Sequence, residues 1–208
     1  MKAKHNLEHI IFNSWKKKSL IKNLNTSAEK IIVGVSGGRD SMVLLATLLR
    51  CIPKQQLIVV HCHHGVGGHA NFRDQADQVV ANFCKKMGVV FERFKSERVL
   101  NSEAEYREFR LSCFETQCRK HSAVIVAMAH HRDDWLENQL MKLIRGSAFA
   151  SLRNNFDWAQ HKQRKFFIWR PLCQVGRADI ESYRVQYKVL FIEDPSNRET
   201  VYFRNWIR

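Results

Sequence analysis

A glycine-rich turn that also carries hydroxyl and carboxyl side chains spans residues 34–41, with the sequence Gly-Val-Ser-Gly-Gly-Arg-Asp-Ser. It follows the apolar run at 31–33 and precedes an apolar stretch at 42–49, which predicts a strand, a turn and then a helix. Such a turn directs backbone N–H groups and a helix N-terminus at one point, where a phosphate group binds favourably. The alternative is an ordinary tight turn between a strand and a helix.

The side chains of this turn suggest what it could hold. Asp40 is a candidate metal ligand, because Mg²⁺ prefers oxygen ligands that it shares with phosphates. Its alternative role is to cap the following helix. Ser36 and Ser41 could donate their hydroxyl groups to the same phosphates, although Ser41 could equally be a plain first-turn residue. Gly37 and Gly38 would let the backbone approach the ligand closely.

A second group of ionisable side chains lies at 130–137, in the sequence His-His-Arg-Asp-Asp-Trp-Leu-Glu. Asp134 and Glu137 are three residues apart, so a helix would place both carboxylates on one face. Two such carboxylates can hold a cation, either Mg²⁺ or the ammonium group of a substrate. The alternative is a helix start resembling a capping box, with Asp133 or Asp134 as the cap.

Three further segments are less specific. Arg107 and Arg110 would share a face of one helix, which by itself is typical of a charged surface helix. The polar segments at 193–197 and 202–208 would each be unremarkable alone. The segment at 153–170 mixes aromatic and basic residues and predicts a hairpin or a long loop. Its aromatic rings could stack on RNA bases, or they could pack into the core beneath a solvated basic turn.

The elements that must position these residues alternate along the chain. We predict strands at 30–35, 57–62, 89–94, 123–128, 166–169 and 189–192, and helices at 41–51, 72–87, 103–121, 134–145 and 177–188. Short apolar strands between longer helices indicate βαβ units and a parallel sheet, which binds ligands beyond the carboxyl ends of its strands. The glycine-rich turn, His63-His64-Gly65 after the second strand and His130-His131 after the fourth strand all fall there. Residues 1–29 predict a leading helix that carries Lys16, Lys17 and Lys18.

The composition limits the class of protein. A chain of 208 residues is one domain or one domain with an appendage, and a net charge of +14 favours a polyanionic partner such as RNA. The six cysteines include no Cys-x-x-Cys pair and suit free thiols in a reducing cytosol. A metal site at His61, Cys62 and His63 is disfavoured, because successive strand side chains point to opposite faces. The sequence contains no apolar run long enough for a membrane span.

Taken together, the ordered motifs resemble the N-terminal catalytic domain of the tRNA(Ile)-lysidine synthetases, a branch of the PP-loop ATPases. The glycine-rich turn alone would indicate only the broader superfamily, whereas the ordered set is specific to this branch. The shared landmarks are Ser36-Gly-Gly-Arg-Asp-Ser41, His64-Gly65, Glu103-Ala-Glu-Tyr-Arg107, Ala129-His-His-Arg-Asp-Asp134 with Glu137, Arg145-Gly146-Ser147, Arg170-Pro171-Leu172, Glu193-Asp-Pro-Ser-Asn197 and Arg204-Asn-Trp-Ile-Arg208.

The resemblance implies an α/β fold, a Rossmann-like PP-loop domain of the adenine nucleotide alpha hydrolase type, with a mostly parallel five-stranded sheet and helices on both faces. It implies a basic leading segment at 1–29 and a catalytic domain at 30–208, without a C-terminal tRNA-binding domain. The implied reaction uses ATP and Mg²⁺ to join L-lysine to C2 of the wobble cytidine in tRNA(Ile) with a CAU anticodon, giving lysidine. We expect a cytoplasmic enzyme, with a second copy of the chain as a further candidate partner.

The resemblance also implies roles for individual residues. ATP binding is implied for Ser36, Gly37, Gly38, Arg39, Asp40, Ser41 and His64, with Asp40 as the Mg²⁺ ligand. Substrate binding is implied for His131, Asp134, Glu137 and Arg107. The catalytic set is Asp40, Arg107, Asp134, Glu137 and Arg204. Lysine must lose a proton before it attacks, so a nearby carboxylate or His131 is the candidate base.

Some positions depart from the family pattern. Asn138 stands where the family usually has threonine, and Val66-Gly67-Gly68 replaces a segment that normally carries arginine. The basic N-terminal helix and the segment at 153–170 are candidates to replace tRNA contacts that longer relatives make elsewhere. Two alternatives stay open: another PP-loop tRNA-modifying enzyme resembling a thiolase, and a non-catalytic RNA-binding relative.

Overall fold

The computed structural model describes residues 5–21, 30–65, 70–146 and 157–193. Its strands form a single sheet in the order β3-β2-β1-β4-β6-β5. All neighbouring strands are parallel except β5 and β6, which are antiparallel. The strands are β1 (Ile31–Gly34), β2 (Leu57–His63), β3 (Val90–Lys95), β4 (Ile125–Ala127), β5 (Trp158–Gln160) and β6 (Phe167–Trp169).

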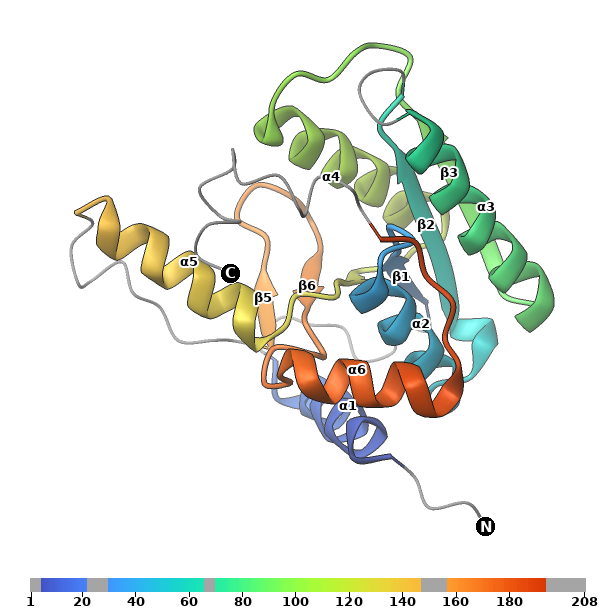
Figure 1. Cartoon of the computed structure of the whole chain (residues 1–208), viewed down its shortest axis with the longest axis vertical. Coiled ribbons are helices and arrows are strands. Elements are labelled where there is room, and N and C mark those ends of the chain that lie inside the picture. Colours follow the sequence, from blue (N-terminus) through green and yellow to red (C-terminus); the bar gives the residue numbers. More distant parts are fainter. Residues whose placement is uncertain (1–4, 22–29, 66–69, 147–156, 194–208) are drawn as a thin grey trace.

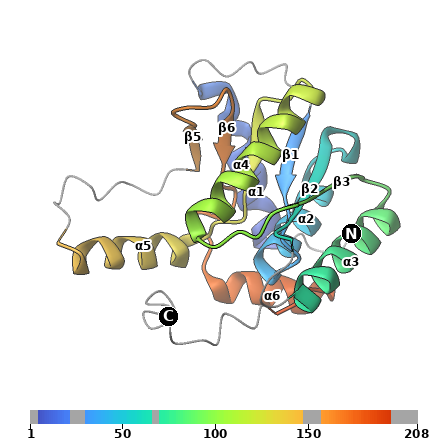
Figure 2. The ribbon, with the colours of Figure 1, turned by 90° about the horizontal axis from the view of Figure 1, so that it is seen from above.

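Helices cover both faces of this sheet, as Figures 1 and 2 show. Short 3-10 turns follow the first helix at Lys17–Leu20 and precede β2 at Lys54–Gln56. The α-helices are α1 (Asn6–Lys16), α2 (Arg39–Cys51), α3 (Ala70–Met87), α4 (Glu103–Lys120), α5 (Arg132–Ile144) and α6 (Arg177–Tyr187).

The central strand β1 is buried on both sides, which explains why its sequence is an unbroken apolar run. Ile31 and Val33 belong to a core that also contains side chains of α1, α2, α3 and α6. Ile32 points to the opposite face and packs in a second core with Phe114 of α4. The glycine-rich turn therefore starts from a strand fixed by two cores.

The leading helix α1 is part of the first core. Leu7 and Ile11 are fully buried there. The indole of Trp169, at the end of β6, donates a hydrogen bond of 2.9 Å to the hydroxyl of Ser14, and Trp158 donates one of 3.1 Å to the Ser14 carbonyl. The division of the chain into a leading segment at 1–29 and a catalytic domain at 30–208 stays a prediction. Helix α1 packs directly against α2 and α6.

The structure confirms the α/β class with a mostly parallel sheet and corrects the number of strands from five to six. The predicted strand at 189–192 is wrong, since residues 189–193 form no strand. Strand β6 already has β4 and β5 as its two neighbours, so its edge is occupied. The backbone N–H of Ile192 instead donates to the Gly37 carbonyl at 3.0 Å, which brings this segment to the glycine-rich turn.

The segment at 153–170 proves to contain the β5–β6 hairpin, and its described aromatic residues belong to the core. Trp158, Phe166, Phe167 and Trp169 are each no more than 7% exposed. They cannot stack on RNA bases in this conformation, so the core interpretation is correct for these four rings. Phe156 lies outside the described residues. None of the described helices combines the length and the apolar character needed to cross a lipid bilayer.

Candidate functional site

The glycine-rich turn connects β1 to α2 at the carboxyl edge of the sheet. The Ser41 hydroxyl donates to the Gly38 carbonyl at 2.9 Å and accepts the backbone N–H of Ser36 at 3.1 Å. The Ser36 hydroxyl lies 3.1 Å from that of Ser41. The first turn of α2 has N–H groups without partners inside the helix, which is the usual basis of anion binding at a helix start. The two serines thus order the backbone around a point suited to phosphate.

Gly37 has a structural reason to be glycine. Its φ is +86°, in the left-handed region that side chains rarely adopt. A Cβ atom at this position would lie 2.9 Å from the Ala76 Cβ and 3.0 Å from the Ala76 carbonyl oxygen in α3. The turn therefore packs closely against α3, and no larger residue fits without movement.

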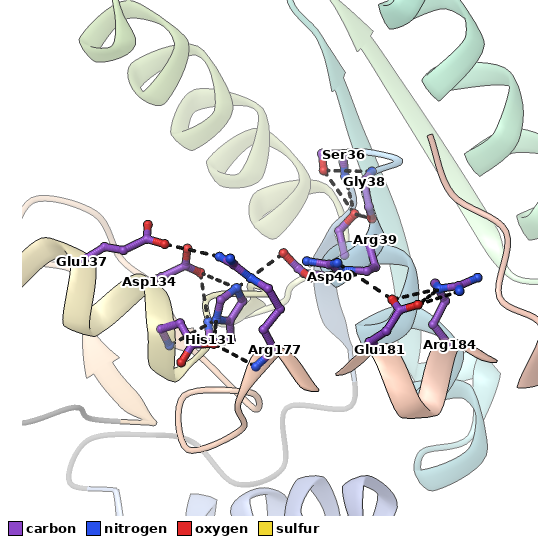
Figure 3. A network of polar contacts seen from close by, with 12 residues as sticks. Ser36, Gly38, Arg39, Asp40, His131, Asp134, Glu137, Arg177, Glu181 and Arg184 are labelled. Atoms are coloured by element: carbon purple, nitrogen blue, oxygen red, sulfur yellow. Dashed lines mark hydrogen bonds and ion pairs between the residues drawn. The ribbon is translucent and has the colours of Figure 1, made fainter. Parts of the chain in front are cut away.

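Asp40 faces the second motif across the edge of the sheet (Figure 3). One of its carboxylate oxygens accepts from the Arg39 guanidinium at 3.1 Å, and the other lies 3.5 Å from Nε2 of His131. Burial raises the pKa of Asp40, but the hydrogen bond and charge of His131 and the charge of Arg39 outweigh it and leave that pKa below its ordinary value. Asp40 is therefore a carboxylate at neutral pH, with its side chain 33% exposed.

The second motif forms the start of α5, and this start is a capping box, as the alternative interpretation expected, but with a different cap residue. Helix α5 begins at Arg132, and His131 is the N-cap, in place of Asp133 or Asp134. Nδ1 of the His131 ring accepts a hydrogen bond from the backbone N–H of Asp133 at 3.2 Å. The Asp134 carboxylate accepts one from the backbone N–H of His131 at 3.1 Å. Nε2 of His131 also lies 3.6 Å from the Asp134 carboxylate. This buried imidazole therefore joins Asp40 and Asp134.

Glu137 follows one turn later and is the buried residue of α5. The Arg177 guanidinium, from the start of α6, contacts its carboxylate at 3.3 Å. The backbone N–H of Arg177 donates to Asp133 at 2.8 Å, and that of Arg132 donates to the Val175 carbonyl at 3.0 Å. Two helices thus start side by side at the site.

Arg177 is a site residue that the sequence patterns did not single out. The available signal was indirect: a glutamate on the interior face of a helix needs a cationic partner. Arg39 likewise has acidic neighbours within the protein, since it contacts Asp40 and lies 3.8 Å from Glu181 of α6. Helix α6 therefore contributes to both parts of the site.

Other predicted site residues lie apart from this network. His64 follows β2 and packs edge-on against the Tyr106 ring of α4, at 4.7 Å between centroids. Burial, followed by the charges of Arg110 and Arg73, lowers the pKa of His64 to about 4, so that its ring is neutral at pH 7. Arg204 lies outside the described residues, as do the landmarks at 194–208.

Arg107 is exposed on α4 and makes no hydrogen bond or ion pair with the described residues. Burial mainly, and the nearby charge of Arg107, lower the pKa values of Arg110 and Arg170. These three arginines thus create a positive region beside the hairpin. It lies on the α4 side of the sheet, whereas α2, which carries Asp40, packs on the opposite face.

No fully protein-built metal centre is seen where the chain is described, since no three ligand-type side chains gather there. His61 and His63 have other partners, the Val35 carbonyl at 2.8 Å and Asp74 at 3.0 Å. Mg²⁺ commonly binds through one or two carboxylates together with phosphates and water. The partly exposed carboxylate of Asp40, beside the glycine-rich turn, fits that requirement. All six cysteines are free thiols, as the sequence predicted.

A glycine-rich turn after a central parallel strand, facing carboxylates that follow the adjacent strand, defines an α/β nucleotide-binding protein. Residues 11–208 match the family described as PP-loop domain, and the chain belongs to this family. ATP binding follows from that membership.

The relatives with curated names support a narrower resemblance. The chain is 33% identical over 207 residues to the tRNA(Ile)-lysidine synthase of Bdellovibrio bacteriovorus, covering 100% of this chain and 62% of that protein. It is also 33% identical over 190 residues to that of Bacillus anthracis, covering 86% of this chain and 38% of the relative. The resemblance indicated by the motifs is thus confirmed, while the chain spans less than two thirds of the length of these relatives.

Solved structures confirm the fold. The U34-tRNA thiolase NcsA from Methanococcus maripaludis superposes with a TM-score of 0.71 at 17% identity, over 97% of this chain and 71% of that one. A phosphoadenylyl-sulfate reductase from Candida auris gives a TM-score of 0.55 at 8% identity, over 93% of this chain and 91% of that one. At these identities the similarity concerns the fold alone.

Proposed function

We propose that this protein is a tRNA-modifying ligase, which uses ATP to join L-lysine to C2 of the wobble cytidine in tRNA(Ile) with a CAU anticodon. The observation that carries the proposal is the contact of His131 with both Asp40 and Asp134, at 3.5 and 3.6 Å. This contact brings the phosphate-binding turn and the carboxylate pair together. A reaction that couples nucleotide cleavage to attack by an amine needs these two features side by side.

The reaction has two steps. First, the C2 oxygen of cytidine attacks the α-phosphorus of ATP, an O–P bond forms, and pyrophosphate leaves from the glycine-rich turn. Second, the ε-amine of lysine attacks C2, the C–O bond breaks, and AMP leaves with the bonding electrons. Mg²⁺ bound at Asp40 would supply charge neutralisation at the phosphates. Arg107 and Arg204 are the proposed contacts of the activated nucleotide, since guanidinium groups suit phosphate geometry.

The carboxylates of Asp134 and Glu137 are the proposed partners of lysine's ammonium charge. The geometry of His131 favours a carboxylate over the imidazole as the base. Because Nδ1 accepts the Asp133 N–H, the proton of a neutral ring lies on Nε2, which faces Asp40 and Asp134. His131 then acts as a hydrogen-bond donor that positions the two carboxylates.

A thiolase-like activity is the second candidate, and it has less support. The solved tRNA thiolase shares the fold at 17% identity. Thiolases of this kind commonly use a Cys-x-x-Cys motif or paired catalytic cysteines, and this sequence has no Cys-x-x-Cys. Five of its six cysteines are buried, and Cys51 is partly exposed. A non-catalytic RNA-binding relative would have no need of the linked Asp40, His131 and Asp134.

The proposal is tested by lysine- and tRNA-dependent release of AMP, with mass spectrometry of the tRNA product. Glu137→Gln should raise the KM for lysine about tenfold or more, because a charge-assisted contact to the ammonium group is lost. Adenylation of the tRNA should survive better than the transfer of lysine. Glu97→Gln, which alters an exposed glutamate after β3, is the matched control and should leave both steps unchanged.

The outcomes separate the candidates. AMP release without lysine in the product would contradict the ligase proposal, and sulfur in the product would support the thiolase instead. RNA binding without any AMP release would indicate the non-catalytic relative. Equal loss of both steps in Glu137→Gln would assign this carboxylate to the nucleotide or its metal.

A further inference from the structure

The contact between Glu137 and Arg177 pairs a buried anion with a partly exposed cation at the proposed amine site. The Glu137 side chain is only 8% exposed, whereas that of Arg177 is 38% exposed. One terminal nitrogen of the guanidinium reaches Glu137 at 3.3 Å. Figure 3 shows the Arg177 side chain extending from α6 to the carboxylates of α5. A cation and an anion are thus presented together at the start of the two helices.

The Arg177 guanidinium retains unused hydrogen-bonding capacity. Its Nε is buried and has no hydrogen-bond partner among the described residues. A guanidinium carries five N–H donors in a planar fork that matches the two oxygens of a carboxylate. The Arg177 side chain as a whole is 38% exposed, and a guanidinium that forms one ion pair has further N–H groups with which to donate to a ligand carboxylate.

Two other arginines of the network are already engaged. Arg39 contacts Asp40 and lies near Glu181. The Arg132 guanidinium is 3.8 Å from the Asp133 carboxylate. It also lies over Gly176, where an added Cβ atom would be 2.4 Å from a terminal nitrogen of Arg132. Arg177 is the arginine of these three that contacts Glu137, so it is the one placed to hold a second anion beside that carboxylate.

The charges of the network match a basic amino acid. Its five carboxylates are those of Asp40, Asp133, Asp134, Glu137 and Glu181, and its four guanidinium groups are those of Arg39, Arg132, Arg177 and Arg184. Counted over these carboxylates and guanidinium groups alone, the network has one more negative charge than positive charges. Free lysine at neutral pH carries two ammonium groups and one carboxylate, and so has a net charge of +1. It would compensate the network, provided that a cationic group receives its carboxylate.

We propose that Arg177 is a specificity-determining residue, which binds the α-carboxylate of the amino acid while Glu137 binds the α-ammonium group. The α-carboxylate and the α-ammonium are attached to one carbon, and the adjacent Glu137 and Arg177 side chains can receive them together. The ε-amine is then left to reach the activated cytidine. The pair thereby distinguishes an amino acid from a simple diamine. The inference rests on the proposed lysine-dependent function and adds Arg177 as the residue that recognises the α-carboxylate of lysine.

The test compares L-lysine with cadaverine, the diamine that lacks only the carboxylate. The wild-type protein should prefer lysine by about ten- to a hundredfold in kcat/KM, the range of a charge-assisted hydrogen bond. Arg177→Gln should remove this preference by raising the KM for lysine, with kcat and the use of cadaverine little changed. Calorimetric titration of each amine into the protein should show the same loss in binding, independently of turnover.

Two further variants keep the result interpretable. Arg177→Lys retains a positive charge and should retain part of the preference. Arg119→Gln removes an equivalent charge from an exposed site on α4 and should behave as wild type. If Arg177→Gln melts at a much lower temperature, the comparison is made with Arg177→Lys, whose preference must then lie below that of wild type.

The possible failures are distinct. A wild-type protein that uses no amine would overturn the proposed function itself. A wild-type protein that uses lysine and cadaverine equally well would overturn only the role of Arg177. An unchanged preference in folded Arg177→Gln would also overturn that role and leave the ligase proposal intact.

Discussion

His131 illustrates how one buried side chain organises the candidate site. The ring caps α5 through Nδ1 and directs Nε2 toward carboxylates from two different helices. Because the ring is 2% exposed, its hydrogen bonds are not shared with solvent. Asp40 is consequently held in its ionised form beside the glycine-rich turn. An ionised carboxylate is the form that a metal ion requires.

We expect Asp40→Asn to lower magnesium-dependent ATP–pyrophosphate exchange by about a hundredfold, as removal of one charge-stabilising group typically does. Removal of Mg²⁺ with a chelator should have a similar effect on the wild type and add little in the variant. The fold should persist, since the Asp40 side chain is 33% exposed and lies outside both cores. Asp74→Asn, at a 65% exposed side chain, serves as the control. Full exchange activity in Asp40→Asn with normal melting would reduce Asp40 to a structural role.

At the scale of elements, the site depends on close approaches between segments that are distant in sequence. The turn after β1 packs against α3 at Ala76. Its Gly37 carbonyl accepts a hydrogen bond from the backbone N–H of Ile192, which follows α6 in the chain. The starts of α5 and α6 exchange hydrogen bonds through Asp133 and Val175. These contacts fix the glycine-rich turn and the carboxylates relative to one another.

Gly37→Ala tests the packing of the turn, with Gly146→Ala as the matched control. Both glycines have positive φ values, +86° and +70°, so both substitutions incur backbone strain. An added Cβ at Gly146 meets nothing within 4 Å, whereas at Gly37 it meets Ala76 at 2.9 Å. The free energy of unfolding should therefore fall by about 1–3 kcal/mol more in Gly37→Ala, a typical cost of overpacking. Equal losses in urea titrations of the two variants would show that the contact with α3 has no energetic role.

At the scale of the whole molecule, the net charge of +14 favours a polyanion, and α1 is placed to contribute. The hydrogen bond from the Trp169 indole to the Ser14 hydroxyl brings the end of α1 to the carboxyl end of β6. The candidate site lies at this same edge of the sheet. Lys16 and Lys18 lie over the rings of Phe12 and Trp15, and Lys17 pairs with Asp157 at 3.0 Å. The three lysines thus form a basic group on that side of the molecule.

Replacing Lys16, Lys17 and Lys18 by Gln should flatten the plot of log K for tRNA binding against log salt. Three phosphate contacts would change the slope by about two to three units, and we expect about two because Asp157 already partners Lys17. Discrimination between cytidine and uridine at the wobble position should not change, because phosphate contacts carry no sequence information. The control replaces Lys85 and Lys86, at the opposite edge where α3 leads into β3. An unchanged slope would mean that the lysines of α1 form only a solvated face.

Several features of this protein could be predicted from the sequence because they depend on neighbouring residues. The unbroken apolar run of β1, the glycine-rich turn and the apolar stretch of α2 specify a strand, a tight turn and a helix in order. The alternation of strands and helices predicted the parallel sheet, and the spacing of Asp134 and Glu137 predicted that both lie on one helix.

Other features were decided only by the tertiary structure. The run at 189–192 has the composition of a strand but forms none; β5 is the neighbour of β6, and the Ile192 N–H donates to the Gly37 carbonyl. His131 caps α5, and Glu137 meets a guanidinium 40 residues away in the chain. Local patterns describe which face of an element is apolar, whereas they carry no information about which distant side chain compensates a buried charge. Only the packing of α6 beside α5 brings Arg177 to Glu137, and with it a candidate site for an amino acid.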